Sequence, residues 1–339
     1  MFDTQEAIER LIVHRARVVA GEVRHIVGDA GGGLWVATQQ HGLYHFEPGG
    51  RVVERYHRGA PEARRLPSNS IRSVYLDEGR HPVIGTAAGL SIYDRQRGTF
   101  LHHRHLAGDP YGLTSNSVRA FFCDRQGNWW IGTWDGVNIY SRQYDHVQMA
   151  RAVPGRTHGL QDNIIHALAE TPDGRLWAGT QQAGVHELDP GQDGVTVHRS
   201  RDEQPGVLAG DNVHALLVDR EGALWVGLFE AGLCRRDPAS GRFTCYRNAP
   251  ADATSLSDDN VYVLLEDRRG VLWVGTNKAG LNEFDPARQA FVRHEADGRA
   301  GSLVGSSVTA LLEDRHGYLW VGTTRGLSRY DARADAFAT

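Results

Sequence analysis

Short apolar runs recur along the whole chain in a fixed order of four kinds, separated by turns rich in glycine and aspartate. The first three kinds are seen in "NVYVLLED" at 260–267, "LWVGT" at 272–276 and "GLNEFD" at 280–285, and a weaker fourth kind in "RFTCYR" at 242–247. A D-x-x-G turn, typical of β-hairpins, joins the first run to the second. Because the first two runs are apolar on both faces, we expect short strands that are covered on both sides.

A tryptophan in the second run marks a repeat that extends over the chain. The marker positions are Trp35, Val83, Trp130, Trp177, Trp225, Trp273 and Trp320, with valine replacing tryptophan in the second unit. Successive markers are 47 or 48 residues apart. Seven units of four antiparallel strands are typical of a β-propeller, whose ring leaves only short, protected sheet edges. The sequence therefore predicts an all-β fold: one seven-bladed β-propeller of four-stranded antiparallel blades over residues 1–339.

The last unit is the least complete. After Asp331 only "ARADAFAT" remains, in which Phe337 matches Phe243 and Phe291 at the start of other fourth strands. The fourth strand of this unit is therefore truncated. We predict that the N-terminal segment 1–20, with "RLIVHRARVV" at 10–19, supplies or completes that strand and closes the ring. A helix over "QEAIERLI" is the alternative for this segment.

The connections on the two faces of such a ring differ in how strictly they repeat. The turns between first and second strands are near-copies of one another, such as "DRRG", "DREG" and "DRHG". The loops between second and third strands differ from unit to unit, which is typical of a surface that is free to specialise. These loops contribute the candidate ligand-binding residues Trp134, Asp135, Gln181, Phe229, Lys278 and Arg325.

The first strand of each unit, which is innermost in a propeller, has a polar or aromatic residue at its second position. These residues are Arg24, Arg72, Arg119, His166, His214, Tyr262 and Thr309, whereas the fourth positions are apolar in every unit. A local rule broken at one place in all units is where a site is expected. We predict that the second positions surround the mouth of the central channel, and we add Arg24, Arg72, Arg119, His166, His214 and Tyr262 to the candidate ligand-binding residues. The alternative is that these polar side chains only face water.

Composition and charge narrow the range of partners. The chain is 40% hydrophobic and 23% charged, as soluble globular proteins are. Its net charge of −4 gives no basic field that would attract nucleic acid or an anionic membrane. The sequence contains neither the apolar run of a transmembrane helix nor the apolar core of a signal peptide. We therefore expect no nucleic-acid partner and no membrane insertion by this chain.

Motifs of catalysis and metal binding are missing from the sequence. It has no GxSxG, HExxH, paired CxxC or P-loop. The histidine-rich "LHHRHL" at 101–106 lies in a fourth strand, where His103 matches His198 and His294 of other units, so we favour a packing role over a metal site. Each D-x-x-G turn offers one carboxylate, too few for calcium. We predict no catalytic residue, no metal and no cofactor.

Cys234 and Cys245 lie symmetrically about the turn at 237–242, which places them opposite each other on paired strands. We expect two free apolar thiols. A disulfide, which would indicate an oxidising compartment, is the alternative.

The repeat resembles a known family. The runs "LTSNSVRAFFCDRQGNWWIGTWDGVNIY" at 113–140 and "LSDDNVYVLLEDRRGVLWVGTNKAGLNEFD" at 256–285 are similar to the two-component regulator propeller repeat, with departures at Gly21, Val83 and Leu228. The resemblance implies a periplasmic sensor module of a bacterial membrane receptor, with any kinase or diguanylate cyclase output outside this chain. It also implies carbohydrate-derived, sometimes acidic ligands. We expect a fragment of such a receptor or a stand-alone relative, with a downstream receptor domain or a dimer as further partner.

Three functions follow as hypotheses. The first is a non-catalytic sensor that binds a small acidic or oligosaccharide ligand at the channel mouth. The second is a metal-dependent lyase similar to the streptogramin-cleaving propellers, which use a histidine at the same place; His166 and His214 support it, but no acid is clearly paired with them. The third is a protein–protein scaffold, which the fold alone does not exclude.

Overall fold

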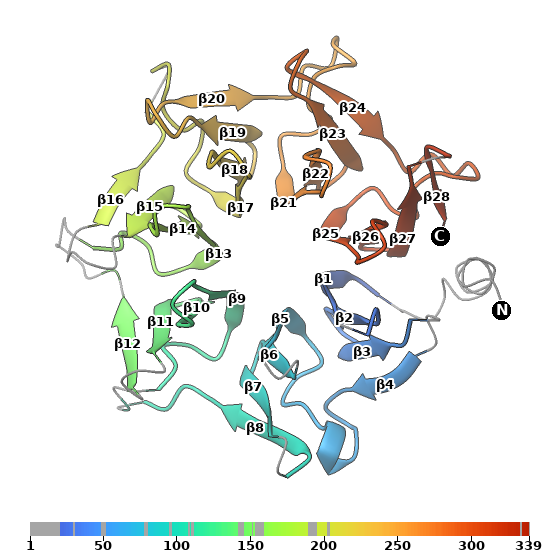
Figure 1. Ribbon diagram of the computed structural model, residues 1–339. Coiled ribbons are helices and arrows are strands. Elements are labelled where there is room, and N and C mark those ends of the chain that lie inside the picture. Colours follow the sequence, from blue (N-terminus) through green and yellow to red (C-terminus); the bar gives the residue numbers. More distant parts are fainter. Residues whose placement is uncertain are drawn as a thin grey trace.

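Seven four-stranded antiparallel sheets are arranged as blades around a central axis in the computed structural model of the protein (Figure 1). The structure describes residues 21–338 apart from 30, 49–51, 78–80, 95–96, 108, 110–111, 142–145, 151, 153–158, 189–194, 202–203 and 333. The predicted seven-bladed propeller is confirmed. The segment 1–20, predicted to complete the last blade, lies outside the described residues.

Each blade uses four strands that are consecutive in the sequence, from the innermost strand to the outermost. Blade 1 comprises β1 (Val23–Gly28), β2 (Leu34–Thr38), β3 (Leu43–Phe46) and β4 (Val52–Tyr56). Blade 2 comprises β5 (Ile71–Leu76), β6 (Pro82–Thr86), β7 (Gly89–Asp94) and β8 (Thr99–His103), preceded by the short 3-10 helix η1 (Glu62–Arg64). Blade 3 comprises β9 (Val118–Cys123), β10 (Trp129–Thr133), β11 (Gly136–Ser141) and β12 (His146–Ala150).

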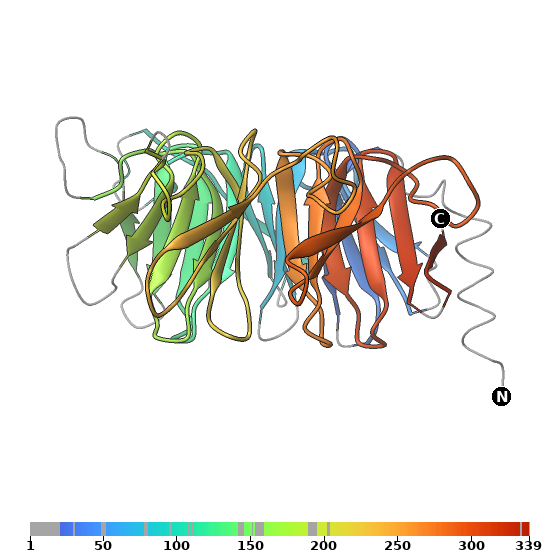
Figure 2. The ribbon, with the colours of Figure 1, turned by 90° about the horizontal axis from the view of Figure 1, so that it is seen from above.

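The remaining blades repeat this order. Blade 4 comprises β13 (Ile165–Glu170), β14 (Leu176–Thr180), β15 (Val185–Leu188) and β16 (Val195–His198). Blade 5 comprises β17 (Val213–Val218), β18 (Leu224–Leu228), β19 (Leu233–Arg236) and β20 (Phe243–Tyr246). Blade 6 comprises β21 (Val261–Glu266), β22 (Leu272–Thr276), β23 (Leu281–Asp285) and β24 (Ala290–His294). Blade 7 comprises β25 (Val308–Glu313), β26 (Leu319–Thr323), β27 (Gly326–Asp331) and β28 (Ala336–Ala338). Seen from the side, the strands run between two faces that carry the loops (Figure 2).

The D-x-x-G-x-L-W motif is a hydrogen-bonded unit at the turn between the first two strands. In blade 5, Asp219 Oδ1 accepts the backbone N–H groups of Glu221 and Ala223 at 3.0 and 2.8 Å, and its Oδ2 accepts the indole N–H of Trp225 at 2.8 Å. The same indole bond occurs in blades 3, 6 and 7, and a threonine hydroxyl replaces the carboxylate in blade 4. One side chain thus fixes both the turn and the large residue that packs beside it.

The same turns also join neighbouring blades. Arg220 Nε contacts Glu266 Oε1 at 2.7 Å, and the backbone N–H of Arg220 donates to Glu266 Oε2 at 2.9 Å. Arg268 repeats the backbone bond with Glu313 at 2.7 Å. The near-identical turns of the sequence are therefore connections between blades, as their repetition predicts for a scaffold.

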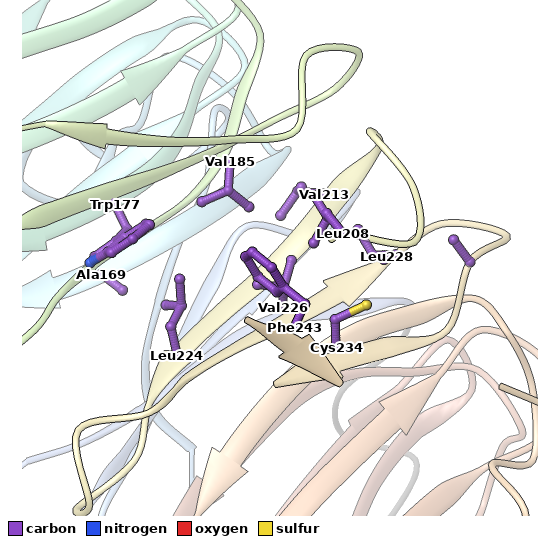
Figure 3. Packing of buried hydrophobic residues seen from close by; sticks show 11 residues of the cluster. Ala169, Trp177, Val185, Leu208, Val213, Leu224, Val226, Leu228, Cys234 and Phe243 are labelled. Carbon is purple, nitrogen blue, oxygen red and sulfur yellow. The ribbon is translucent and has the colours of Figure 1, made fainter. Parts of the chain in front are cut away.

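Apolar side chains fill the space between adjacent blades. Between blades 4 and 5, Trp177 of β14 is 1% exposed and belongs to one buried cluster with Val213, Leu224 and Phe243 (Figure 3). A glycine in the second strand allows this approach: a Cβ on Gly179 would lie 2.5 Å from the Cγ1 atom of Val213. Such contacts are far shorter than packed carbon atoms tolerate, so the glycine of "LWVGT" sets the spacing of the blades.

Blade 7 packs on blade 1 in the same way as the other neighbours. A Cβ on Gly322 would lie 2.6 Å from Val23 Cγ1, and the Thr309 hydroxyl donates to the carbonyl oxygen of Val23. The outermost strand of blade 7 is the short β28, in which Phe337 is buried. In the described residues, the ring is thus joined through the inner strands β1 and β25.

Cys234 and Cys245 form a disulfide between β19 and β20, so the expectation of free thiols is wrong. The two residues are direct partners in the strand register, with Cα atoms 4.1 Å apart. Residues opposite each other at a non-hydrogen-bonded position of an antiparallel pair are about this close. Cys123 is half-buried and is not part of a disulfide.

We predict that the indole bond of blade 5 stabilises the fold measurably. Asp219→Asn retains an oxygen for the turn but replaces the acceptor of the Trp225 N–H by a donor, which leaves a mostly buried N–H unpaired. We expect the free energy of unfolding to fall by about 1–3 kcal/mol, measured by urea titration. The matched control Glu221→Gln, on a side chain that is 76% exposed, should change it by less than about 0.5 kcal/mol. Equal effects of the two variants would contradict this role.

We also predict the thiol content of the unfolded chain. Thiol titration in denaturant without reductant should find one thiol, Cys123, and after reduction three, because the other two cysteines are bonded. Three thiols before reduction, in protein purified from an oxidising compartment, would show that the disulfide does not form.

Candidate ligand-binding site

A β-bulge begins the innermost strand of every blade. The pairing of each innermost strand with its neighbour shifts register between the first and third residues: Val23/His25, Ile71/Ser73, Val118/Ala120, Ile165/Ala167, Val213/Ala215, Val261/Val263 and Val308/Ala310. The extra residue in each bulge is the second position singled out by the sequence. Bulges bend a strand and redirect a side chain, and they are frequent beside functional sites.

The seven bulged residues line one cavity of about 330 Å³. They are Arg24, Arg72, Arg119, His166, His214, Tyr262 and Thr309, all of them half-buried. The structure thus brings together the six inner-strand residues that were predicted as candidates, and Thr309 completes the ring. The apolar fourth positions do not line this cavity but pack between blades, as Leu216 does against the cluster of Trp177.

The variable loops lie on the same face as this cavity. The backbone N–H of Trp134 donates to the carbonyl of Ser117 at 3.3 Å, and that of Phe229 to Asn212 at 2.9 Å, which ties both loops to the starts of inner strands. The Trp134 ring lies 5.2 Å from the Arg119 guanidinium carbon, and the Phe229 ring 5.5 Å from the His214 ring. Trp134 and Phe229 therefore adjoin the lining.

None of the six predicted loop residues is part of the cavity lining; besides Trp134 and Phe229, which adjoin it, they are Asp135, Gln181, Lys278 and Arg325. Backbone groups hold each in its loop; the N–H of Lys278, for example, donates to Asp258 Oδ2 at 3.0 Å. Arg325 is exposed. The prediction that these four bind a ligand stays a prediction.

Three arginines from consecutive blades form one side of the cavity. Arg24 has an acidic partner, Glu22, at 2.9 Å, but its buried Nε and that of Arg72 have no hydrogen-bond partner. Burial, followed by the positive charge of Arg24, lowers the pKa of Arg72. Burial, then the charges of Arg72 and Arg24, lowers the pKa of Arg119 to about 10. The guanidinium groups therefore destabilise one another, and an anion would relieve this.

The other side of the cavity is aromatic and uncharged. The His214 ring stacks on Tyr262 with centroids 4.9 Å apart and meets His166 edge-on at 4.7 Å. His166 Nδ1 lies 3.1 Å from the carbonyl oxygen of Val213, so this nitrogen carries the proton and Nε2 is the acceptor in the neutral ring. Burial, followed by the charge of Arg119, lowers the pKa of His166 to about 3 and that of His214 to about 4. Both rings are neutral at physiological pH.

Two features of the site escaped the sequence-based prediction. Glu22, which pairs with Arg24, lies two residues before it, and this spacing is the only signal that could have found it. The bulges leave no mark in the hydrophobic pattern beyond the polar second position itself. Thr309 occupies that position but was not among the candidate residues.

The structure offers little for metal chemistry. No group of three or more histidine, cysteine, aspartate or glutamate side chains within the described part of the chain could hold a metal ion, and no carboxylate is among the seven cavity residues. The histidines in fourth strands pack on the repeat tryptophans instead, His198 on Trp177 at 5.4 Å and His294 on Trp273 at 5.6 Å. No helix among the described residues is long and apolar enough to cross a membrane.

Comparison with known families identifies the repeat. The family described as "Two component regulator propeller" matches residues 112–135, 159–182, 207–230, 255–278 and 302–325, one segment in each of blades 3 to 7. Five segments of the chain are therefore two-component regulator propeller repeats. The resemblance drawn from the sequence is thus confirmed. A search of curated proteins finds no match to the sequence.

Solved structures share the fold of this propeller. One is an extracellular domain ascribed to the hybrid two component system BT3049 of B. thetaiotaomicron, with a TM-score of 0.76 and 22% sequence identity. The matched region is 92% of this chain and 40% of the BT3049 chain. A second, from BT4673 of the same organism, has a TM-score of 0.52 and 21% identity, with 93% and 41% coverage. The chain thus spans about two fifths of these extracellular domains. A third is virginiamycin B lyase of Staphylococcus aureus, with a TM-score of 0.64 and 11% sequence identity; the matched region is 91% of this chain and 93% of the lyase.

We predict that the propeller loses stability as the pH falls from about 7.5 to about 5. Burial is the largest cause that lowers the pKa of six histidines in the folded state: His25, His102, His103, His166, His186 and His214. The unfolded chain, with histidine pKa values of about 6.5, takes up protons first, so stability is full above that pH and is lost towards the folded-state values. Urea unfolding at the two pH values measures the loss.

The variant His214→Phe tests one of these contributions. Phenylalanine retains the stacking on Tyr262 but has no proton to bind, so the difference in unfolding free energy between the two pH values should shrink. An unchanged difference would show that His214 is not held neutral by the fold.

Proposed function

We propose that this chain is a non-catalytic sensor propeller that binds a small acidic ligand, of the carbohydrate-derived kind, in the cavity at the channel mouth. The observation that carries the proposal is the cavity itself, in which seven bulged residues meet and two buried guanidinium Nε atoms have no partner. A buried donor without a partner is costly, and a bound carboxylate or phosphate would satisfy it with charge-assisted hydrogen bonds. Trp134 and Phe229 would contact the part of the ligand that extends outward.

The proposal includes a place in a receptor. The structural relatives are extracellular domains ascribed to a hybrid two component system and to a one component system, and this chain spans about two fifths of them. We propose a periplasmic location, with a downstream receptor domain or a second copy as further partner. The disulfide supports this location, because such bonds persist in oxidising compartments.

The alternative is a lyase, which the fold shared with virginiamycin B lyase keeps in view. His166 and His214 lie close enough to act together. Burial and the charge of Arg119 lower the pKa values of both rings to about 3 and about 4. Such low pKa values make the two histidines weak general bases at physiological pH. Metal analysis combined with an assay of streptogramin cleavage separates this candidate from a sensor.

We predict that an acidic monosaccharide stabilises the propeller more than its neutral counterpart. At equal concentration, galacturonate should raise the melting temperature and galactose should not, because only the acid reaches the unpaired arginines. A ligand at 100 times its Kd adds about 2.7 kcal/mol, or about 4 °C for a chain of this size. A thermal-shift series over concentration measures the effect.

The variant Arg72→Gln with Arg119→Gln provides the matched test. It should abolish the shift while the ligand-free protein melts at the same or a higher temperature, because removing like charges relieves repulsion. Arg299→Gln, at an arginine that is 87% exposed and outside the cavity lining, serves as control and should retain the shift. A shift that survives in the double variant would contradict binding at this cavity.

A further inference from the structure

The arginine side of the cavity carries two positive charges that no side chain neutralises. Of the three arginines, only Arg24 has a carboxylate partner, Glu22 at 2.9 Å. Within the part of the chain that the structure describes, neither Arg72 nor Arg119 pairs with an acidic side chain, and the cavity lining contains no carboxylate. The cation–π contact of Arg119 with Trp134, at 5.2 Å, leaves the charge of the guanidinium unchanged.

The remaining lining adds no charge of either sign. His166 donates its Nδ1 proton to the Val213 carbonyl, and His214 stacks between aromatic neighbours, Tyr262 at 4.9 Å and Phe229 at 5.5 Å. The cavity therefore has a net charge of +2 at one side, from Arg72 and Arg119, and an uncharged, aromatic surface at the other. Its volume of about 330 Å³ is at the small end for ligand pockets, which limits the occupant to about one ring and one head group.

We infer that the cavity takes a doubly charged anion, a phosphate monoester or a dicarboxylate, whose two negative charges lie against Arg72 and Arg119. A monoanion would leave one buried guanidinium uncompensated, which is costly in a site of low dielectric. A neutral body attached to the head group would lie against His214 and Tyr262. This inference rests on the proposed function, since it concerns the same cavity.

Pairs of small anions that differ by one charge test the inference. Methyl phosphate and dimethyl phosphate form one pair, succinate and succinamate the other; isothermal titration is done near pH 7.5 at constant ionic strength, so that screening is equal. We expect at least one dianion to bind about tenfold more tightly than its monoanionic partner, equivalent to about 1.4 kcal/mol. The pair that shows the larger ratio identifies the head group as phosphate or dicarboxylate.

Variants assign the charge preference to the two arginines. Arg72→Gln and Arg119→Gln should each reduce the ratio to about twofold or less, whereas Arg299→Gln should leave it unchanged. Equal binding of monoanions and dianions to the wild type, or a ratio that Arg299→Gln reduces as much as Arg72→Gln, would overturn the inference. If galacturonate still binds in that case, the proposed function stands; if no acid binds at all, both are wrong.

Discussion

In six of the seven blades a glycine in the second strand allows close approach to the next blade, and both the ring and the site depend on this contact. Blade 1 has Ala37 at this position. The glycine leaves room for the branched first residue of the neighbouring inner strand, as Gly275 does for Val308, where an added Cβ would lie 2.6 Å from a methyl group. That first residue is fully buried and therefore fixed. The bulge begins at the next residue, so the second position is displaced towards the channel mouth. Packing between blades thus determines where the cavity residues lie.

The rigid ring explains how like charges are held together. Arg24, Arg72 and Arg119 come from three inner strands whose spacing is set by the buried contacts and by the Arg–Glu connections of the opposite face. A less constrained chain would separate the guanidinium groups. Strain of this kind is stored at functional sites when the surrounding structure over-determines the geometry. In the ligand-free protein, the packing of the inner strands holds the guanidinium groups together against their mutual repulsion.

The repeat pattern predicted more of the fold than of the candidate site. The spacing of the tryptophan markers was sufficient for seven blades and four strands, because each unit buries the same faces. The polar second positions were equally visible, and six of the seven cavity residues were named from them. The loop residues were less predictable: variation marked Trp134 and Phe229, which adjoin the cavity, but also Gln181 and Lys278, which do not line it.

The features that the sequence did not predict depend on geometry across strands. Cys234 and Cys245 lie opposite each other, as their positions about the turn predicted, but they are bonded, where two free apolar thiols were expected. The D-x-x-G motif indicated a turn, but not that its carboxylate also accepts a tryptophan N–H from the next strand. The sequence predicted which strands pair, but not which side chains form bonds with each other.

The division of the cavity into a charged and an uncharged side follows from one further interaction. The charge of Arg119 helps to keep His166 and His214 neutral, so the histidines cannot add to the positive charge at physiological pH. A bound anion beside Arg119 would cancel that influence and raise the pKa values of both rings. Under the proposed function, blades 1 to 3 supply the charges and blades 4 to 6 supply the groups that respond to them. A ligand at the channel mouth would thereby couple two halves of the ring that the apolar contacts between blades hold at fixed distance.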